Sequence, residues 1–386
     1  MTFDDTAIAF KAKSDSDLRK THFLFSSMKK PWMVKTGTVL TSVALKVKLP
    51  VKRLIKSTIF DQFCGGESIN DCAQTINQLG EFRVHTILDY SVEGQESEES
   101  FDSTIEELVR SAVYAKNNEH IPFCVSKFTG IGSMSLMTKI QSGQKLSLTE
   151  QQQFEKFKER ADRLAKTAHD NHIKFLIDAE DSWVQDVIDQ IAYDLMLKYN
   201  KERPVVYNTY QLYRHEALDM MKTAHKKITD AGCFFGAKLV RGAYMEKERE
   251  RAEELNYPDP IQPDKASTDR DYDAAMQYAI DHIDTFSICA GTHNEQSSAL
   301  LTEMMAQKGI EKSDERVYFA QLLGMSDNIS FKLADEGYNV AKYVPYGPVE
   351  KVMPYLFRRA NENTSIAGQT GRQFSLIQAE MKRRKK

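Results

Sequence analysis

Short apolar runs recur along most of the chain, and longer segments with a helical spacing of apolar positions separate them. Eight of these runs have the length and composition of buried parallel strands. They are His85–Tyr90, Phe123–Phe128, Lys174–Ala179, Pro204–Thr209, Phe235–Arg241, Phe286–Gly291, Val317–Leu322 and Val340–Pro345. The intervening amphipathic segments predict helices, and the clearest are Thr149–Asp170, Trp183–Tyr199 and Asp271–Asp284.

Eight strand–helix units over about 290 residues have the size and order of a parallel (β/α)8 barrel of the TIM type. A doubly wound open sheet is the alternative α/β fold. No GxGxxG follows the first predicted strand and no Walker sequence occurs in the chain, so the usual nucleotide fingerprints of the open sheet are missing. The pattern therefore favours an α/β barrel that is preceded by a helical region.

We expect three parts along the chain. Residues 1–84 form a basic, mainly helical region, residues 85–372 form the barrel, and residues 373–386 form a basic C-terminal tail. The run Lys382–Lys386 contains only Lys and Arg, which is typical of a solvated, disordered end.

The N-terminal region is unusually basic. Between Leu18 and Phe60 there is no Asp or Glu, while ten Lys or Arg residues are interleaved with aromatic and aliphatic residues such as Trp32. One interpretation is a helical cap whose apolar side packs on the barrel. The other is a contact with an anionic membrane surface, in which apolar side chains insert and the cations pair with lipid head groups. Nucleic-acid binding is a weaker third option, since no recognition motif accompanies the charge.

Composition narrows the class of protein. With 386 residues and 41% hydrophobic content the chain can bury a large core, and a net charge of −3 gives no reason to expect nucleic acid as a partner. The five cysteines form no CxxC pair, which argues against a disulfide framework or a structural zinc site and fits a reducing compartment. No signal peptide is visible, and no run approaches the roughly 18 apolar residues of a membrane span. We therefore expect a cytoplasmic protein.

Polar side chains collect where the predicted strands end, which is where a barrel carries its active site. In chain order these residues are Asp89, Lys127, Asp178, Glu180, Asn208, Tyr210, Gln211, Lys238, Arg241, Tyr244, Thr292, His293, Asn294, Gln321 and Tyr346. Several cations at one mouth would repel one another unless carboxylates or an anionic ligand neutralise them. A metal site built from Asp178, Glu180 and His293 is an alternative, but their spacing is not that of a specific metal motif.

The last predicted strand runs into a helix through Tyr346-Gly347-Pro348. Because proline disrupts a helix beyond its first turn, the regular helix is predicted to begin near Pro354. Tyr355, Arg358, Arg359 and Glu362 then share one helical face. This face is either a solvated basic surface or a two-pronged clamp for carboxylate or phosphate.

Taken together, five ordered motifs resemble those of monofunctional proline dehydrogenase, a flavoenzyme with an FAD-bearing barrel. They are Ile177–Glu180, Asn208–Gln211, Lys238–Tyr244, Thr292–Asn294 and Arg358-Arg359-x-x-Glu362. The resemblance implies oxidation of L-proline to Δ1-pyrroline-5-carboxylate by hydride transfer to FAD, with electrons passed to a membrane quinone. A separate pyrroline-5-carboxylate dehydrogenase would use the product. The location implied is peripheral, at the inner face of the membrane, or on the matrix side of a mitochondrion in a eukaryote.

The resemblance also implies roles for individual residues at the substrate. Arg358, Arg359 and Lys127 match the cations that bind the proline carboxylate, and Glu362 matches a residue that orients an arginine. Asp178 matches a carboxylate that holds the cationic groups. The remaining matches to the ring pocket are Tyr346, Tyr355, Ala243 and Leu322.

For the flavin, Lys238 resembles the cation near the N5 edge of the isoalloxazine ring. Asn208 and Gln211 resemble its polar ring contacts, and Arg241 and His293 the pyrophosphate and adenosine contacts. Tyr244, Thr292 and Asn294 complete the cofactor motifs. The bifunctional branch of the family carries Arg and Lys at the positions of Lys238 and Arg241, so this chain is more similar to the eukaryotic-style monofunctional branch.

Three other functions remain open at this stage. A hydroxyproline dehydrogenase would have the same fold, although a bulky Tyr346 at the ring favours proline. An inactive barrel could serve as a membrane-binding module through its basic N-terminal region. A metal-dependent lyase is the third. Hydride loss from a carbon beside an amine needs an electron sink and no strong nucleophile, which agrees with the absence of a nucleophile motif.

Overall fold

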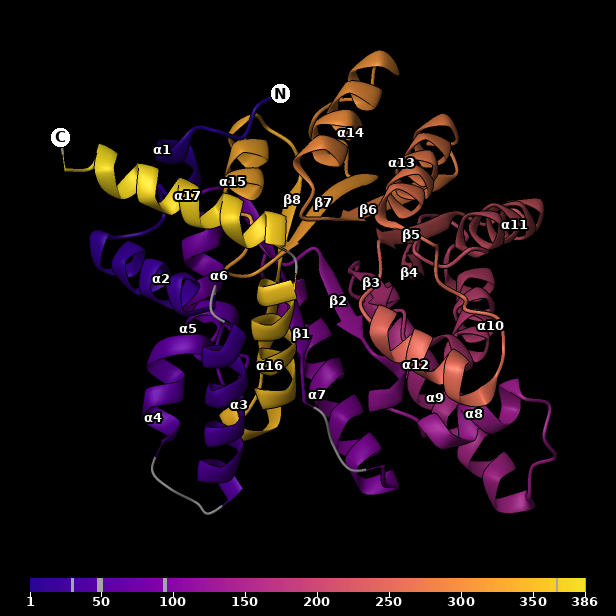
Figure 1. Ribbon diagram of the computed structural model, residues 1–386. Helices are drawn as coiled ribbons and strands as arrows, with labels where there is room; N and C mark the ends of the chain where they lie inside the picture. The colour runs from indigo at the N-terminus through magenta and orange to yellow at the C-terminus, as the bar shows by residue number, and fades with distance from the viewer. Residues whose placement is uncertain (29–30, 47–50, 93–95, 366, 386) are drawn as a thin grey trace. The chain divides into compact units, whose positions relative to one another are not determined.

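The computed structural model describes residues 1–28, 31–46, 51–92, 96–365 and 367–385 (Figure 1). Its eight strands follow one another in sequence order around a closed barrel, and every pair with a defined register is parallel. The strands are β1 (Val84–Tyr90), β2 (Phe123–Ser126), β3 (Lys174–Ile177), β4 (Val206–Gln211), β5 (Phe235–Val240), β6 (Phe286–Gly291), β7 (Val317–Leu322) and β8 (Val340–Tyr346). The predicted (β/α)8 barrel is confirmed.

The helices after the strands form because their sequences carry helical periodicity and, in several cases, an N-cap. They are α7 (Glu98–Lys116), α8 (Met134–Gln141), α9 (Leu148–Asp170), α10 (Ser182–Tyr199), α11 (Ala217–Asp230), α12 (Met245–Leu255), α13 (Lys265–Asp281), α14 (Glu295–Gln307), α15 (Asp327–Asp335) and α16 (Val349–Ser365), with the 3-10 turn η2 (Phe128–Gly130) after β2. At the start of α9, Ser147 and Glu150 form a capping box, in which each side chain accepts from the other's backbone N–H.

The chain divides into two compact units. One comprises Gly94–Ala320 and contains β2 to β6, the start of β7 and the helices α7 to α14. The other comprises Met1–Glu93 and Gln321–Lys386, and it contains β1, β8 and the helices nearest the two ends of the chain. We call them the central unit and the terminal unit.

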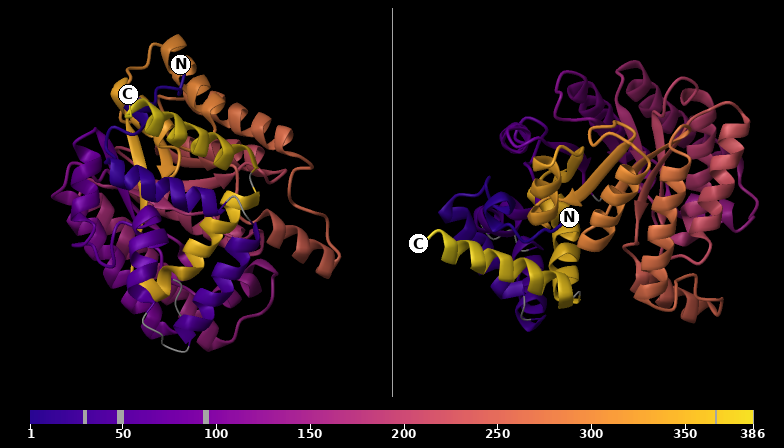
Figure 2. Two further views of the ribbon diagram at one scale, coloured as in Figure 1. Left: turned by 60° about the vertical axis from the view of Figure 1, so that its left-hand side comes forward. Right: turned by 90° about the horizontal axis from the view of Figure 1, so that it is seen from above.

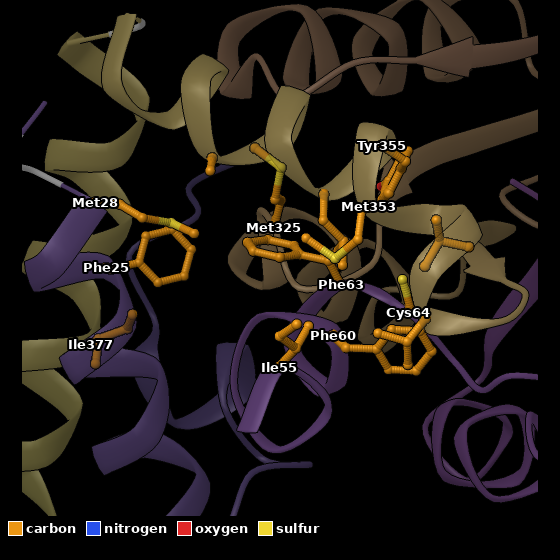
Figure 3. Close-up of a cluster of buried hydrophobic side chains, with 14 of the residues drawn as sticks. Phe25, Met28, Ile55, Phe60, Phe63, Cys64, Met325, Met353, Tyr355 and Ile377 are labelled. Atoms are coloured by element: carbon orange, nitrogen blue, oxygen red, sulfur yellow. The ribbon is translucent and has the colours of Figure 1, made fainter. Parts of the chain in front are cut away.

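The terminal unit begins with a series of helices, most of which have a buried side. They are α1 (Thr6–Ala9), α2 (Asp15–Met28), α3 (Pro31–Lys46), α4 (Lys52–Ile55), the π-helical turn η1 (Lys56–Phe60), α5 (Asp61–Phe63) and α6 (Ala73–Gly80). Figure 3 shows Phe25, Phe60 and Phe63 gathered in one apolar cluster with Met353 and Tyr355 of α16. The basic N-terminal segment thus buries an apolar side within its own unit, as the helical-cap interpretation expects.

The outer side of the same helices also carries apolar residues. Phe23, Trp32, Leu40 and Leu54 are each more than 60% exposed, and Val39 is 56% exposed. Single exposed apolar residues are ordinary on a protein surface. Five of them within one basic segment distinguish this segment from an ordinary surface. Among the described residues, no helix is both long enough and apolar enough to cross a membrane.

The prediction that a regular helix begins near Pro354 is wrong. Helix α16 begins at Val349, and Pro354 lies inside it. The proline has no N–H for the carbonyl of Glu350, so one helical hydrogen bond is lost. Burial outweighs that loss, because Val349 and Val352, both fully buried, pack into the apolar cluster before the proline is reached.

The disordered end expected for Lys382–Lys386 is a second error. Helix α17 (Ala367–Arg383) includes Lys382 and Arg383, covers most of the expected tail 373–386, and lies beside α2 (Figure 2). Its buried Glu380 is bound by Arg383 and Arg384, and Arg384 also donates to the carbonyl oxygens of Phe10 and Lys13 at 2.9 and 2.8 Å. The basic charges are therefore used to join the last helix to the first ones. Lys386 lies outside the described residues.

Candidate active site

A lysine–carboxylate–lysine group lies at the strand ends of the central unit. Lys127 follows β2, Asp178 follows β3 and Lys238 lies within β5. The Nζ atom of Lys127 is 3.3 Å from Oδ2 of Asp178, and Lys238 forms an ion pair with Oδ1 of the same carboxylate. The side chain of Lys238 is 7% exposed and that of Lys127 is 33% exposed, so the group is buried on one side and open on the other.

This group has a net positive charge. Its two ammonium groups and one carboxylate sum to one positive charge, which the nearby carboxylate of Glu180 offsets in part when it is ionised. A partly buried cation favours a bound anion more strongly than a fully solvated one. The sequence places the three residues here because parallel strands end at the same edge of a barrel. We name these residues the Lys127–Asp178–Lys238 group. They were predicted as site residues, and the structure brings them together.

Glu180 belongs to a different set of contacts. Its Oε1 accepts from the backbone N–H of Thr129 at 2.9 Å, and its Oε2 accepts from the hydroxyl of Thr129. Burial raises the pKa of Glu180 to about 7, against the lowering effect of the Thr129 hydrogen bonds and of the nearby Lys127. Thr129 lies in the 3-10 turn η2 that follows β2.

The two amides of the Asn208–Gln211 motif point in different directions. Gln211 donates to the carbonyl of Glu180 at 2.8 Å and accepts from the backbone N–H of Ala243 at 3.3 Å. Asn208 instead donates to Asp189 of α10 at 2.8 Å, on the side of β4 that faces the helices. Burial also raises the pKa of Asp189, to about 6. This placement of Asn208 does not support the predicted contact with a flavin ring, whereas the position of Gln211 is compatible with one.

Arg241, just after β5, has its own partners. It donates to Oδ1 of Asp269 at 2.6 Å, to the hydroxyl of Thr292 at 2.8 Å and to the hydroxyl of Ser297 at 2.9 Å. Its guanidinium group also lies 4.3 Å from the ring centroid of Tyr272. Asp269 and Ser297 were missed from the sequence because both lie within helices, away from any strand end.

The Thr292–Asn294 motif forms the start of α14. Asn294 is its N-cap, with Oδ1 accepting from the N–H groups of Gln296 and Ser297. His293, which lies between Thr292 and Asn294 in the chain, is half-buried. The motif therefore combines a hydroxyl that binds Arg241 with the N-terminal end of a helix, which favours negative charge.

The Gly242–Tyr244 turn needs its glycine. Gly242 has φ of +139°, and a Cβ there would lie 2.4 Å from the ring of Tyr213. The turn brings Ala243, which is exposed, next to Gln211 and places Tyr244 as the N-cap residue of α12. The sequence predicted this segment as part of the site.

In the terminal unit, Tyr346 ends β8 and is fully buried. Its ring centroid is 5.3 Å from that of Tyr90, which pairs with it across the β1–β8 ladder. Gly347 follows with φ of +144°, and a Cβ there would lie 2.8 Å from Val92. The turn into α16 therefore requires glycine, as the break in the apolar pattern suggested.

Helix α16 carries the predicted arginine pair. Arg358 and Arg359 are half-buried, and the guanidinium group of Arg359 lies 5.2 Å from the ring centroid of Tyr355, one turn earlier. Tyr355 is 6% exposed and belongs to the apolar cluster of Figure 3, against which Leu322 also packs. Glu362 lies in α16, but its side chain is outside the described residues.

The described residues contain no group of three His, Cys, Asp or Glu side chains that could hold a metal ion. The metal alternative needed Asp178, Glu180 and His293 to converge. Asp178 is instead bound by two lysines and Glu180 by Thr129. The geometry therefore does not support the metal-dependent lyase.

Comparisons with known proteins agree with the motifs. The family model described as Proline dehydrogenase matches residues 72–372. "Proline dehydrogenase 1, mitochondrial" of Dictyostelium discoideum is 30% identical over 98% of this chain and 74% of its own length. "Hydroxyproline dehydrogenase" of Xenopus laevis is 30% identical over the whole chain and 90% of its own length.

The human "Proline dehydrogenase 1, mitochondrial" is 40% identical, but over 61% of this chain and 40% of its own length. Among solved structures, the proline utilization A (PutA) protein of Bdellovibrio bacteriovorus superposes with a TM-score of 0.78 at 19% identity, over 94% of this chain and 41% of that one. This likeness shows the fold alone. The family match and the relatives of comparable length show that the chain belongs to the proline dehydrogenase family.

Proposed function

We propose that this protein is an FAD-dependent proline dehydrogenase. It oxidises L-proline to Δ1-pyrroline-5-carboxylate, passes the electrons to a membrane quinone, and leaves the product to a separate pyrroline-5-carboxylate dehydrogenase. The observation that carries the proposal is the Lys127–Asp178–Lys238 group, a net cation at the strand ends of a barrel of the proline dehydrogenase family. A small amino acid with a carboxylate suits that charge.

The donors of the central unit fit a flavin by their chemistry. Gln211 is a buried amide, Lys238 is a buried cation for an electron-rich ring, and Arg241 with the start of α14 offers positive charge for a pyrophosphate. His293, Thr292, Asn294 and Tyr244 would complete the set. Bound FAD would supply the electron sink for the hydride that leaves the carbon beside the amine.

The chain's own residues would bind and orient the substrate. Lys127, on the open side of its group, and the arginine pair Arg358 and Arg359 would bind the carboxylate through charge-assisted hydrogen bonds. Asp178 would keep the two lysines close together despite their mutual repulsion. The assignment of the arginines and of Lys127 to one ligand rests on the sequence motifs.

Aromatic and apolar residues would size the ring of the substrate. Tyr346 is fixed by its burial and by Tyr90, and Tyr355 by its place in the apolar cluster. Ala243 and Leu322 would add apolar contacts. A rigid wall is what separates proline from a hydroxylated analogue, because an unpaired hydroxyl against apolar atoms is costly.

A visible absorption spectrum of the purified protein, recorded before and after adding L-proline without oxygen, tests the proposal. We expect a flavin band that bleaches with proline and returns when a soluble quinone is added. Protein without a flavin band, or with a band that proline leaves unchanged at saturating concentration, would reject the function.

Hydroxyproline oxidation is the second candidate. The Xenopus laevis relative that matches this chain over 90% of its own length is named "Hydroxyproline dehydrogenase". The bulky, fully buried Tyr346 favours proline. Comparing kcat/KM for L-proline and trans-4-hydroxy-L-proline decides between them, and a higher value for the hydroxylated substrate would reverse the assignment.

We also propose that the protein is peripheral at a membrane, on the inner face in a bacterium or the matrix side in a mitochondrion. The exposed apolar residues of α2 to α4 and the surrounding Lys and Arg residues support this contact. The names of several relatives include "mitochondrial". Inner apolar residues such as Phe25 and Phe60 are core residues, so the contact would use only the outer side.

A further inference from the structure

Glu180 is a buried carboxylate for which the proposed reaction has no direct use. It comes two residues after Asp178, in the segment that follows β3. It is 5% exposed, and both of its carboxylate oxygens accept from Thr129. Thr129 lies two residues after Lys127 in the chain. One short segment therefore holds the Lys127–Thr129 turn at two points, at Lys127 through Asp178 and at Thr129 through Glu180.

The backbone of Glu180 is held firmly enough to make this contact directional. Its N–H donates to Oε1 of Gln185 at 2.7 Å, and its carbonyl accepts from Nε2 of Gln211 at 2.8 Å. These bonds come from α10 and β4, two different elements. The side chain of Glu180 thus starts from a fixed point when it binds Thr129.

The charge state of Glu180 affects this hold. An ionised carboxylate offers acceptors to both Thr129 donors, whereas a protonated carboxyl keeps fewer acceptor positions and adds a donor of its own. With the pKa of Glu180 raised to about 7 by burial, this change falls close to neutral pH. The charged groups near Glu180 are Lys127, which favours the ionised form, and Asp178, which opposes it.

We propose that Glu180 is a positioning residue for Lys127, which it keeps in place by holding the backbone and hydroxyl of Thr129. The inference rests on the proposed function, because the position of Lys127 matters to catalysis only if the Lys127–Asp178–Lys238 group binds the substrate carboxylate. It adds that substrate affinity depends on the ionisation of a carboxylate that does not itself touch the substrate.

The variant Glu180→Gln tests this directly, because it keeps the volume of the side chain but has one acceptor oxygen for two donors. Lys127 should then be held less firmly. We expect its acylation by an excess of acetic anhydride, followed by peptide mass spectrometry, to be several-fold faster than in the wild type. Lys116, an exposed lysine of α7 outside this group, should be labelled at an unchanged rate and serves as the internal control.

Glu248→Gln is the matched control variant. Glu248 is also fully buried, and it accepts from the backbone N–H and the hydroxyl of a single residue, Ser182, at 2.6 and 2.5 Å. The general cost of losing such a carboxylate is therefore common to both variants. Glu248 has no contact with the turn that carries Lys127 among the hydrogen bonds of the described residues, so Lys127 labelling should not change in this variant.

Kinetics give the second readout. In Glu180→Gln we expect KM for L-proline to rise roughly tenfold, with kcat changed less and flavin content unchanged, which corresponds to loss of a charge-assisted contact. An inflection near pH 7 in kcat/KM of the wild type should disappear. Thr129→Val, which replaces only the hydroxyl by a methyl group, should raise KM by a smaller factor. This variant tests the same contact if Glu180→Gln does not fold.

The outcomes separate the two proposals. Unchanged Lys127 labelling and an unchanged pH profile in Glu180→Gln, or equal labelling changes in Glu180→Gln and Glu248→Gln, would overturn the positioning role while leaving proline oxidation intact. A wild-type protein that does not oxidise proline would overturn the proposed function first. The labelling result does not depend on activity.

Discussion

Each unit of the molecule contains a buried carboxylate that is shared by two lysines. In the central unit Asp178 is shared by Lys127 and Lys238. In the terminal unit Asp327, at the start of α15, pairs with Lys342 of β8 at 2.9 Å and with Lys13 at 3.7 Å. The two groups have the same residue types and the same net charge.

Their surroundings differ. Lys342 is fully buried and also donates to the carbonyl oxygens of Leu322 and Met325, so the three protons of its ammonium group all have acceptors. Burial lowers the pKa of Lys342, against the attraction of Asp327. Lys127, in contrast, is 33% exposed at a strand end. Exposure and position along the strand, more than residue type, separate a structural ion pair from one that can bind a ligand.

Lys342→Met should have the largest effect on stability. It leaves Asp327 buried with only the distant Lys13, and breaking a buried pair in this way costs about 3–5 kcal/mol. Urea unfolding of the variant and the wild type measures the loss. Lys13→Met is the control, because Lys13 is farther from the carboxylate and more exposed, and it should cost less than about 1 kcal/mol. Equal losses in the two variants would show that the buried lysine has no special role.

Asp178→Asn should have the opposite profile, with a large effect on catalysis and a smaller one on stability. Without the shared carboxylate, Lys127 and Lys238 repel each other and lose the charge that orients them. We expect kcat/KM for L-proline to fall roughly 100-fold, the lower part of the range for truncating a buried charge pair. Asp327→Asn is the matched comparison and should mainly lower the free energy of unfolding. If Asp178→Asn is the more destabilising of the two, the comparison fails.

Much of the fold was predictable because hydrophobic periodicity reports on it directly. All eight strands were placed to within two residues, from apolar runs such as Phe286–Gly291. The errors occurred where packing overrode a local rule. Pro354 lies inside α16 because Val349 and Val352, which precede it, are buried. The basic C-terminal end is helical because Glu380 and carbonyl oxygens near the N-terminus accept hydrogen bonds from its arginines.

The site was predictable at strand ends and not beyond them. Lys127, Asp178 and Lys238 end or lie near the ends of apolar runs, so barrel geometry alone brings them together. The direction of Asn208 was not predictable, because a strand presents alternate faces and only the contact with Asp189 shows that this side chain faces α10. The partners of Arg241 lie in helices, where a lone Asp or Ser has no sequence signal.

Arg358→Ala and Arg359→Ala should each raise KM for L-proline, by roughly 10- to 100-fold, because each removes a charge-assisted contact with the carboxylate. Flavin content should not change, since the predicted flavin residues lie in the central unit. Steady-state kinetics and the flavin absorbance of the same preparation measure both quantities. Lys351→Ala, an exposed cation on the same helix, is the control. An unchanged KM in both arginine variants would show that the pair is only a solvated basic face.

The pH dependence of stability should identify Glu180. Its pKa is raised in the folded protein from the ordinary value of 4.5 to about 7. Between these two values the unfolded chain has already released the proton that the folded protein still holds, so stability contributed by this group falls as pH rises. Urea unfolding from pH 4.5 to 7.5 should show this slope to be smaller in Glu180→Gln. Asp189→Asn should remove a slope in a lower window, from 3.8 to about 6, and identical profiles for the two variants would contradict the assignment.

The smallest effect is expected at the outer side of the terminal unit. Trp32→Glu and Leu40→Glu each replace an exposed apolar residue with an anion, so binding to vesicles that contain anionic lipid should weaken several-fold in a flotation assay. Truncating residues 1–60 would be a poorer test, because it also removes the core residues Phe25 and Phe60. Leu148→Glu is the matched control, since Leu148 is 78% exposed but lies in the central unit. Equal loss of binding in all three variants would indicate a general charge effect, and no loss in any would leave the basic helices with their packing role alone.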